Sequence, residues 1–169
     1  MMKYYGAYTV IEYPSGYPRL TLESLEKMEV EAEELLRERE YIQACEKYYK
    51  IAEEIVKALG EYYAPETMEK VLERVDKGFT PWTTRLLNKA VDEILSNIRW
   101  EDTEYEGIFR DGWRAAVTLH REGFHDFELT LRDILHEVRK VKGMIALAKD
   151  ILRNIEGNFE RCSDTTGSK

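Results

Sequence analysis

Cysteine and glutamine are scarce in this chain. The first shortage bears on whether disulfides hold the fold, and the second on its thermal stability. One of the two cysteines, Cys45, lies on an apolar stripe and the other, Cys162, in a polar stretch, so no disulfide framework is expected. Gln43 is the only glutamine, whereas Glu, Lys and Arg are plentiful, a bias that is typical of hyperthermophile proteins. We therefore expect a cytoplasmic protein of high thermal stability.

Long apolar runs and an excess of basic charge are also missing. No uninterrupted apolar run approaches the roughly 20 residues that span a bilayer, and the first ten residues do not resemble a signal peptide. The 25 Lys and Arg residues are outnumbered by 33 Asp and Glu, which gives a net charge of -8. That balance argues against a protein that coats nucleic acid non-specifically. We expect no interaction with a membrane. Nucleic acid is a possible partner but not the favoured one.

The remaining composition, 43% hydrophobic and 34% charged, is that of an ordinary globular protein. Residues 1–20 are rich in tyrosine and end in a Pro-Ser-Gly-Tyr-Pro turn, which predicts an N-terminal aromatic arm. Such an arm forms either a short strand or an extended segment against the bundle or a second subunit. We expect one helical domain over residues 21–159 and a mobile polar tail over residues 160–169.

From Thr21 onward the apolar residues recur with the helical period, which predicts an all-α, antiparallel bundle of about six helices. Capping and breaking residues suggest where each helix begins and ends. The expected helices are Leu22–Arg39, Tyr41–Leu59 with Gly60 as a left-handed stop, a third from Pro65, a fourth capped by Thr80 before Pro81, a fifth from Thr103 or Asp111, and a sixth capped by Thr130 with Asp133.

The sixth helix has the longest apolar pattern in the sequence. Its steps of three and four are those of an a/d seam sustained for more than three heptads, and they place Leu131, Ile134, Val138, Val141, Ile145, Ala148, Leu152 and Ile155 on one face. Further apolar residues widen this face, so the helix is expected to serve both the core and a subunit contact. The predicted partner is a second copy of the chain, and the interface candidates are Val138, Val141, Ile145 and Leu152. The alternative is a core helix alone.

Two segments of the chain resemble the archaeal PaREP-type proteins, a branch of the HEPN superfamily of helical bundles. They are AEELLREREYIQACEKYYKIAEEIVKAL (residues 32–59) and GWRAAVTLHREGFHDFELTLRDILHEVRKVKGMIALA (residues 112–148), which together cover more than a third of the chain. The resemblance implies an antiparallel bundle that is commonly a symmetric dimer. Some HEPN proteins are ribonucleases with an Arg followed, after four to six residues, by His. Others are binding or accessory modules without that activity.

Arg114 and His120 are the pair in this sequence that has the family's Arg-to-His spacing. The implied chemistry is metal-independent RNA cleavage, in which histidine moves the proton of a 2′-hydroxyl and arginine stabilises the phosphorane charge. Six steps of about 100° along a continuous helix leave the two side chains about 120° apart, so a helix break or a dimer would have to bring them together. His120 also lies on an apolar stripe, where a hydrogen-bonded core histidine is the common explanation, and Ala115 stands where active members often have a polar residue.

The favoured interpretation is therefore a HEPN-like dimeric interaction or accessory module without catalysis of its own, whose protein partner stays open. The alternative is a toxin-like HEPN ribonuclease that uses Arg114 and His120. No cofactor is expected, and no metal site either, because the three histidines lack the i, i+4 spacing of a helical metal pair.

A basic flank of the sixth helix allows two interpretations. It could contact the phosphates of RNA or DNA, or it could face the glutamates of the first helix, with its aliphatic stems covering the apolar seam. We favour the second, because the acidic face of the first helix needs a complement. The residues of this flank are Arg132, Arg139, Lys142, Lys149 and Arg153.

Overall fold

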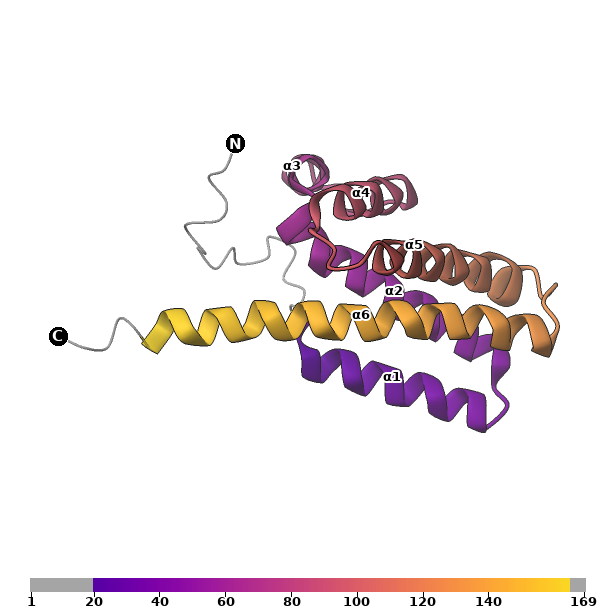
Figure 1. The fold of residues 1–169 in the computed structure, drawn as a ribbon. Helices are drawn as coiled ribbons and strands as arrows, with labels where there is room; N and C mark the ends of the chain where they lie inside the picture. The colour runs from indigo at the N-terminus through magenta and orange to yellow at the C-terminus, as the bar shows by residue number, and fades with distance from the viewer. Residues whose placement is uncertain (1–19, 165–169) are drawn as a thin grey trace.

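The computed structural model describes residues 20–164, which form helices joined by short connections and contain no strand (Figure 1). Apart from its last residue, the predicted N-terminal arm lies outside the described residues. The elements are α1 (Leu22–Arg37), α2 (Tyr41–Tyr63), α3 (Pro65–Asp76), α4 (Thr84–Asn97), α5 (Thr103–Thr118), the π-helical turn η1 (Leu119–His125) and α6 (Leu131–Asp164). The prediction of an all-α bundle of about six helices is confirmed.

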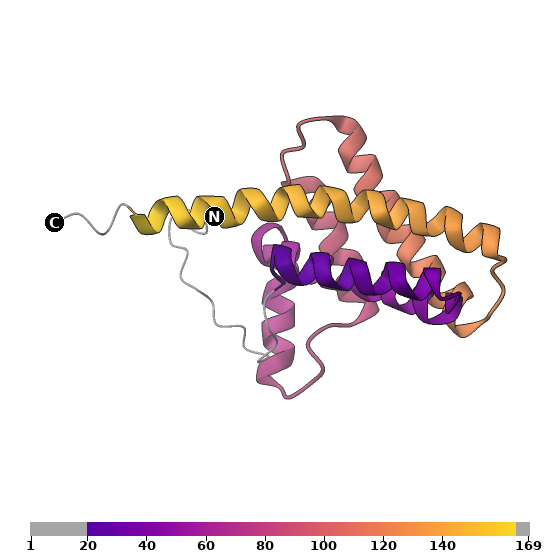
Figure 2. The ribbon, with the colours of Figure 1, turned by 90° about the horizontal axis from the view of Figure 1, so that it is seen from below.

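Helices α2 and α6 organise the bundle. α6 runs along the molecule with α1 on one side and α5 on the other, while α2 lies behind it (Figure 1). Figure 2 shows the same α1 and α6 side by side from below, with α3 to one side and roughly perpendicular to both. α1 and α2 are antiparallel, and so are α5 and α6. Among the described residues, α2 contacts every other helix and η1, so its side chains reach most of the interior.

Local capping explains several of the helix boundaries. The side chain of Thr21 accepts a hydrogen bond from the backbone N–H of Ser24, and Ser24 in turn accepts one from the N–H of Thr21, which forms a capping box before α1. α1 ends at Arg37 because Arg39 adopts a left-handed conformation, with φ of 65°. Thr130 and Asp133 form the same reciprocal arrangement before α6, as the sequence predicts.

Gly60 does not end α2 as expected. The helix continues to Tyr63, and Gly60 is buried inside it. A Cβ atom at this position would lie 3.5 Å from the ring of Trp82 and 3.8 Å from Ala90, which are ordinary packing distances, so this position lies inside the bundle and not at a helix end. The prediction was wrong because a glycine in a helical pattern can serve packing as well as a stop.

α4 begins later than predicted. Thr83, not Thr80, is its N-cap residue, and the Thr83 side chain accepts a hydrogen bond from the N–H of Leu86. Thr80 lies in the preceding connection, where its carbonyl accepts a hydrogen bond from the side chain of Arg74. Both Thr80-Pro81 and Thr83 fit a helix start by composition, and the tertiary contacts of the connection decide between them.

The last two helices also differ from expectation at their ends. α5 begins at Thr103, the earlier of the two predicted starts, but its N-cap residue is Asp102. α6 extends to Asp164, so residues 160–164 of the predicted tail are helical. The contact between α5 and α6 is the most extensive in the bundle, and it positions the end of α5 from which the candidate site is built.

Candidate functional site

The turn η1 continues α5 but changes its hydrogen-bonding pattern. π-Helical turns are rare and occur often at functional sites. This one packs against α2, and Gly123 makes the close approach possible, because a Cβ atom there would lie 2.7 Å from Sγ of Cys45. Burial raises the pKa of the Cys45 thiol to about 11, so this cysteine is an unreactive packing residue. η1 therefore holds its exposed residues at a defined position above α2.

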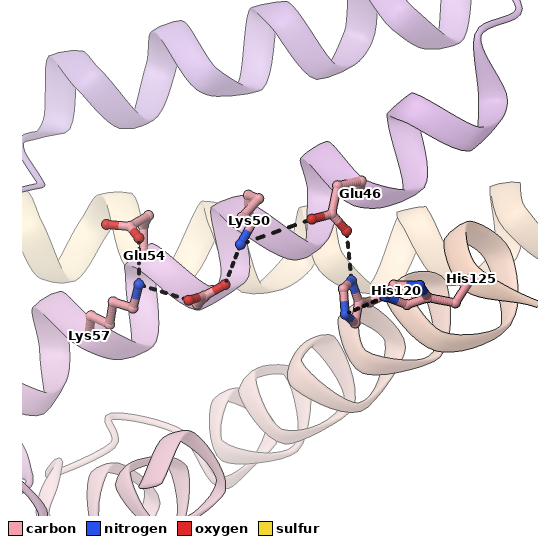
Figure 3. Close-up of polar contacts among 7 residues, drawn as sticks. Glu46, Lys50, Glu54, Lys57, His120 and His125 are labelled. Atoms are coloured by element: carbon pink, nitrogen blue, oxygen red, sulfur yellow. Dashed lines mark hydrogen bonds and ion pairs between the residues drawn. The ribbon is translucent and has the colours of Figure 1, made fainter. Parts of the chain in front are cut away.

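His120 lies at the start of η1 and is bound to a carboxylate of α2. Its Nδ1 atom is 2.6 Å from Oε2 of Glu46 (Figure 3). Its ring stacks on that of Tyr49, with the ring centroids 4.1 Å apart. The His120 side chain is 30% exposed and that of Glu46 is 24% exposed. His120 is thus hydrogen-bonded, as expected of a core histidine, but it lies at the surface of the core and is open to solvent.

A second histidine of η1 meets the first. Nε2 of His125 is 3.2 Å from Nε2 of His120, and the two rings are nearly perpendicular. On an α-helix, residues five apart would point about 140° away from each other. In a π-helix the repeating hydrogen bond joins residues i and i+5, so such residues lie on the same side. The spacing of the histidines in the sequence gives no reason to pair His125 with His120, and the π-helical turn is what brings the two rings together.

Beyond Glu46, charged residues of α2 form a chain of ion pairs. Nζ of Lys50 lies 4.0 Å from Glu46 and 3.1 Å from Glu53, and Nζ of Lys57 lies 2.8 Å from Glu53 and 3.0 Å from Glu54 (Figure 3). Burial by itself would raise the pKa of Glu53, but hydrogen bonds and charges from Lys57 and Lys50 together lower it. Glu53 is therefore held as an anion between its two lysines.

The ring of Tyr49 forms the floor of the site. Burial, and then the negative charges of Glu53 and Glu46, raise its pKa to about 12. Tyr49 is therefore a neutral aromatic platform at physiological pH. It orients the His120 ring by stacking and takes no part in proton transfer.

Arg114, the other half of the predicted pair, lies on the exposed face of α5. The residues on either side of it, Trp113 and Ala115, are buried. Within residues 20–164, no hydrogen bond or ion pair joins Arg114 to His120. In the single chain, His120 therefore has Glu46 and His125 as its polar partners, and Arg114 is available to other molecules.

The four interface candidates on α6 are all buried in the core of the single chain, and none of these residues is more than 4% exposed: Val138, Val141, Ile145 and Leu152. The middle part of the a/d seam of α6 is thus covered by the other helices of its own chain. A subunit contact through α6 would have to use other side chains of that helix. Dimerisation itself stays a prediction.

The basic flank of α6 divides into two parts. Lys142 pairs with Glu33 and Lys149 with Glu29, both on α1, as favoured from the sequence. Arg153 pairs with Asp150 of its own helix at 2.7 Å. By contrast, Arg132 and Arg139, nearer the start of α6, are exposed, and neither forms an ion pair within the described part of the chain. These two arginines are the cations of the flank that remain free for a phosphate.

Two absences hold for the part of the chain that the structure describes. No group of three or more His, Cys, Asp or Glu side chains is arranged to hold a metal ion. No helix among residues 20–164 has the length and apolar character that crossing a membrane requires.

Sequence reasoning found His120 but missed Glu46, Tyr49 and the role of His125. Glu46 is 74 residues from His120 in the chain, so no local spacing connects them. Glu46 and Tyr49 do stand three apart on one helical face, and His120 and His125 flank Gly123. These patterns point to a shared site only once η1 is known to pack on α2.

The fold and the site define a small all-helical protein with a partly exposed histidine–glutamate pair. The model of the archaeal PaREP1/PaREP8 family matches residues 20–145, and the chain belongs to this family. It is also similar to a protein of Sulfolobus solfataricus whose crystal structure is known, with 33% identity and a TM-score of 0.56 over 75% of this chain and 93% of that one. No curated protein matches the chain.

Proposed function

We propose that this protein is a metal-independent ribonuclease of the HEPN kind in which His120 transfers protons. The observation that carries the proposal is the hydrogen bond between His120 and Glu46 at a partly exposed position. A structural core histidine has no need of solvent access, whereas a general base must reach the substrate. The geometry thus favours the alternative that the sequence ranked second.

Glu46 has a definite role in this chemistry. When its carboxylate accepts the proton of Nδ1–H, the Nε2 atom of His120 carries the lone pair, and Nε2 is the atom that can take a proton from a ribose 2′-hydroxyl. The resulting alkoxide attacks the adjacent phosphorus, the bond to the 5′-oxygen breaks, and that oxygen accepts a proton. In this mechanism His125 donates the second proton, and the products are a 2′,3′-cyclic phosphate and a 5′-hydroxyl.

The negative charge that develops on the phosphate in the transition state requires a nearby cation. Arg114, on α5 shortly before η1, is the candidate. Because Arg114 faces solvent in the single chain, it would act on the site of a second copy in a homodimer. Arg132 and Arg139 lie near the start of α6, at the end of the bundle to which η1 leads (Figure 1). They would bind the flanking phosphates of the RNA.

A binding module without catalysis is the second candidate. It is favoured by the contact of His120 Nε2 with His125, because a lone pair that is already hydrogen-bonded must be released before it can accept a proton. In that case His120, His125 and Glu46 would serve only to hold η1 against α2.

Cleavage of a defined RNA by untagged protein in excess EDTA tests the proposal. The wild type should release fragments that end in a cyclic phosphate. His120→Ala and Arg114→Ala should each abolish this activity, and Glu46→Gln should reduce it by up to about 10⁴-fold, because the orienting carboxylate that selects the tautomer of His120 is lost. Arg153→Ala, which removes a cation farther along α6, should remain active.

Circular dichroism must show that each variant retains its helices. Failure of the wild type to cleave RNA would contradict the proposal and favour the binding module. Activity that persists in folded His120→Ala would place the cleavage elsewhere, and the proposal would be wrong.

A further inference from the structure

We propose that His120 and His125 form a two-histidine site for a divalent transition-metal ion such as Cu²⁺, Ni²⁺ or Zn²⁺. The two Nε2 atoms would bind the ion, and Glu46 would orient His120 through the hydrogen bond to its other ring nitrogen, Nδ1. This inference does not depend on RNA cleavage, because it follows from the positions of the nitrogens alone.

The separation of the two nitrogens suits a shared ion. Two imidazole nitrogens that each lie about 2.1 Å from one ion are about 3.0 Å apart at a right angle and about 3.4 Å apart at the tetrahedral angle. The Nε2 atoms of His120 and His125 are 3.2 Å apart, which lies between these values. Both side chains therefore reach the distance of neighbouring ligands without moving the backbone.

The orientation of the rings points the same way. Their centroids are 4.5 Å apart, not much more than the 3.2 Å between the nitrogens, and the ring planes meet at 86°. Rings that met end to end would have centroids separated by the nitrogen distance plus two ring radii. The observed centroid distance is shorter than that, so the axes through the two Nε2 atoms are inclined to each other and not collinear, as binding of one ion requires.

Glu46 provides the support that ligand histidines usually have. A metal-binding histidine commonly donates its other ring N–H to a carboxylate, which orients the ring and raises its basicity. Nδ1 of His120 lies 2.6 Å from Oε2 of Glu46, so the tautomer with a lone pair on Nε2 is favoured. Stacking on Tyr49 holds the same ring in place. One ligand is thus preorganised before the ion arrives.

The π-helical turn explains how histidines at this spacing meet. The i, i+4 pair of an α-helix is the familiar helical metal motif, whereas His120 and His125 are five residues apart on η1. His125 is exposed and His120 is partly exposed, so an ion and its waters can enter. With two protein ligands, water would complete the coordination, and Cu²⁺ should bind most tightly of the three ions.

An ion at this position would take the Nε2 lone pair that proton transfer needs. If the proposed function holds, such ions inhibit cleavage, and this consequence rests on that function. The binding itself can be measured without RNA, so failure of one proposal does not decide the other.

Titration of untagged, EDTA-treated protein with Cu²⁺, followed by electron paramagnetic resonance, tests the site. We expect one tightly bound ion per chain, with hyperfine splitting from two imidazole nitrogens. His125→Ala and His120→Ala should each weaken binding at least tenfold, and Glu46→Gln about tenfold, as is usual for the loss of a supporting carboxylate. His136→Ala removes the third histidine, which is exposed on α6, and should leave binding unchanged.

His125→Asn serves as a second variant if His125→Ala loses its helical circular dichroism. An affinity that is unchanged in both His125 variants would overturn the proposal. A spectrum with a single nitrogen ligand, or binding lost only in His136→Ala, would overturn it equally.

Discussion

Glu53 is the most deeply placed carboxylate of the chain of ion pairs beside the site. Its side chain is 13% exposed, and its oxygens lie 2.8 Å from Lys57 and 3.1 Å from Lys50. A carboxylate that is this buried is stable as an anion only while its cations remain, because removal of one partner leaves charge that is poorly solvated. The free energy of unfolding should therefore depend on Lys57 and on the pH.

Lys57→Met should lower the free energy of unfolding by about 1–2 kcal/mol at pH 7, since it removes charge-assisted hydrogen bonds but leaves Lys50. The depressed pKa of Glu53 means that its stabilisation is complete above the ordinary value of 4.5 and is lost as the pH falls through the lower folded value. The difference between variant and wild type should therefore shrink at acid pH. Urea unfolding at pH 7 and pH 3 measures this.

Lys77→Met, at an exposed position, is the control and should change stability by less than about 0.5 kcal/mol. An equal loss at both pH values would show that packing of the Lys57 stem, and not its charge, is what matters.

At the scale of elements, the close contact of α5 with α6 depends on one glycine. A Cβ atom on Gly112 would lie 2.4 Å from Cβ of Met144 and 3.0 Å from the carbonyl oxygen of Lys140. Neither neighbour is the end of a flexible side chain, so the helices would have to separate. η1 follows directly from α5, and the same displacement would move His120 away from Glu46.

Gly112→Ala should therefore destabilise the protein by about 3 kcal/mol, at the upper end of the usual range for overpacking. Gly107→Ala is the matched control in the same helix, because nothing lies within 4 Å of a Cβ there. It should stabilise the protein by about 0.5–1 kcal/mol through helix propensity. Thermal or chemical unfolding of both variants tests this, and a neutral Gly112→Ala would contradict the close contact.

For the whole molecule, the open question is how a second copy would be bound. The apolar seam of α6 is covered within the chain, but Leu131 and Leu135 of that helix are each 45% exposed. They adjoin Arg132 and Arg139, and they lie toward the end of the bundle that carries η1. A homodimer through this part of α6 would bring two candidate sites toward each other, which is what an Arg114 acting between subunits requires.

Light scattering at micromolar concentration should give twice the chain mass of 19.9 kDa. Leu135→Glu should shift the protein to the monomer while the helices persist, because it places a charge in the contact but not in the core. Phe79→Glu, an exposed substitution in the α3–α4 connection, should remain dimeric. A monomeric wild type would make the predicted dimer wrong. Val141→Glu is a poor probe, since Val141 is fully buried in the single chain and its replacement should unfold the protein.

The number and the order of the helices follow from the sequence alone, because their cause is local. The 3.6-residue period of apolar side chains, the Thr130–Asp133 cap and the first-turn Pro65 each act within a few residues, and each is found in the structure. The pairing of Lys142 and Lys149 with the glutamates of α1 also follows, since an acidic face needs a basic complement.

Tertiary structure alone decided the site. The sequence shows glycines at positions 112 and 123, but only the neighbouring helices reveal that they permit close approach. The π-helical turn that brings His120 and His125 together depends on how α5 packs against α2, which no local pattern encodes. Glu46 reaches His120 across 74 residues of chain. Contacts of that kind arise from the packing of whole helices, so local periodicity cannot predict which side chains meet.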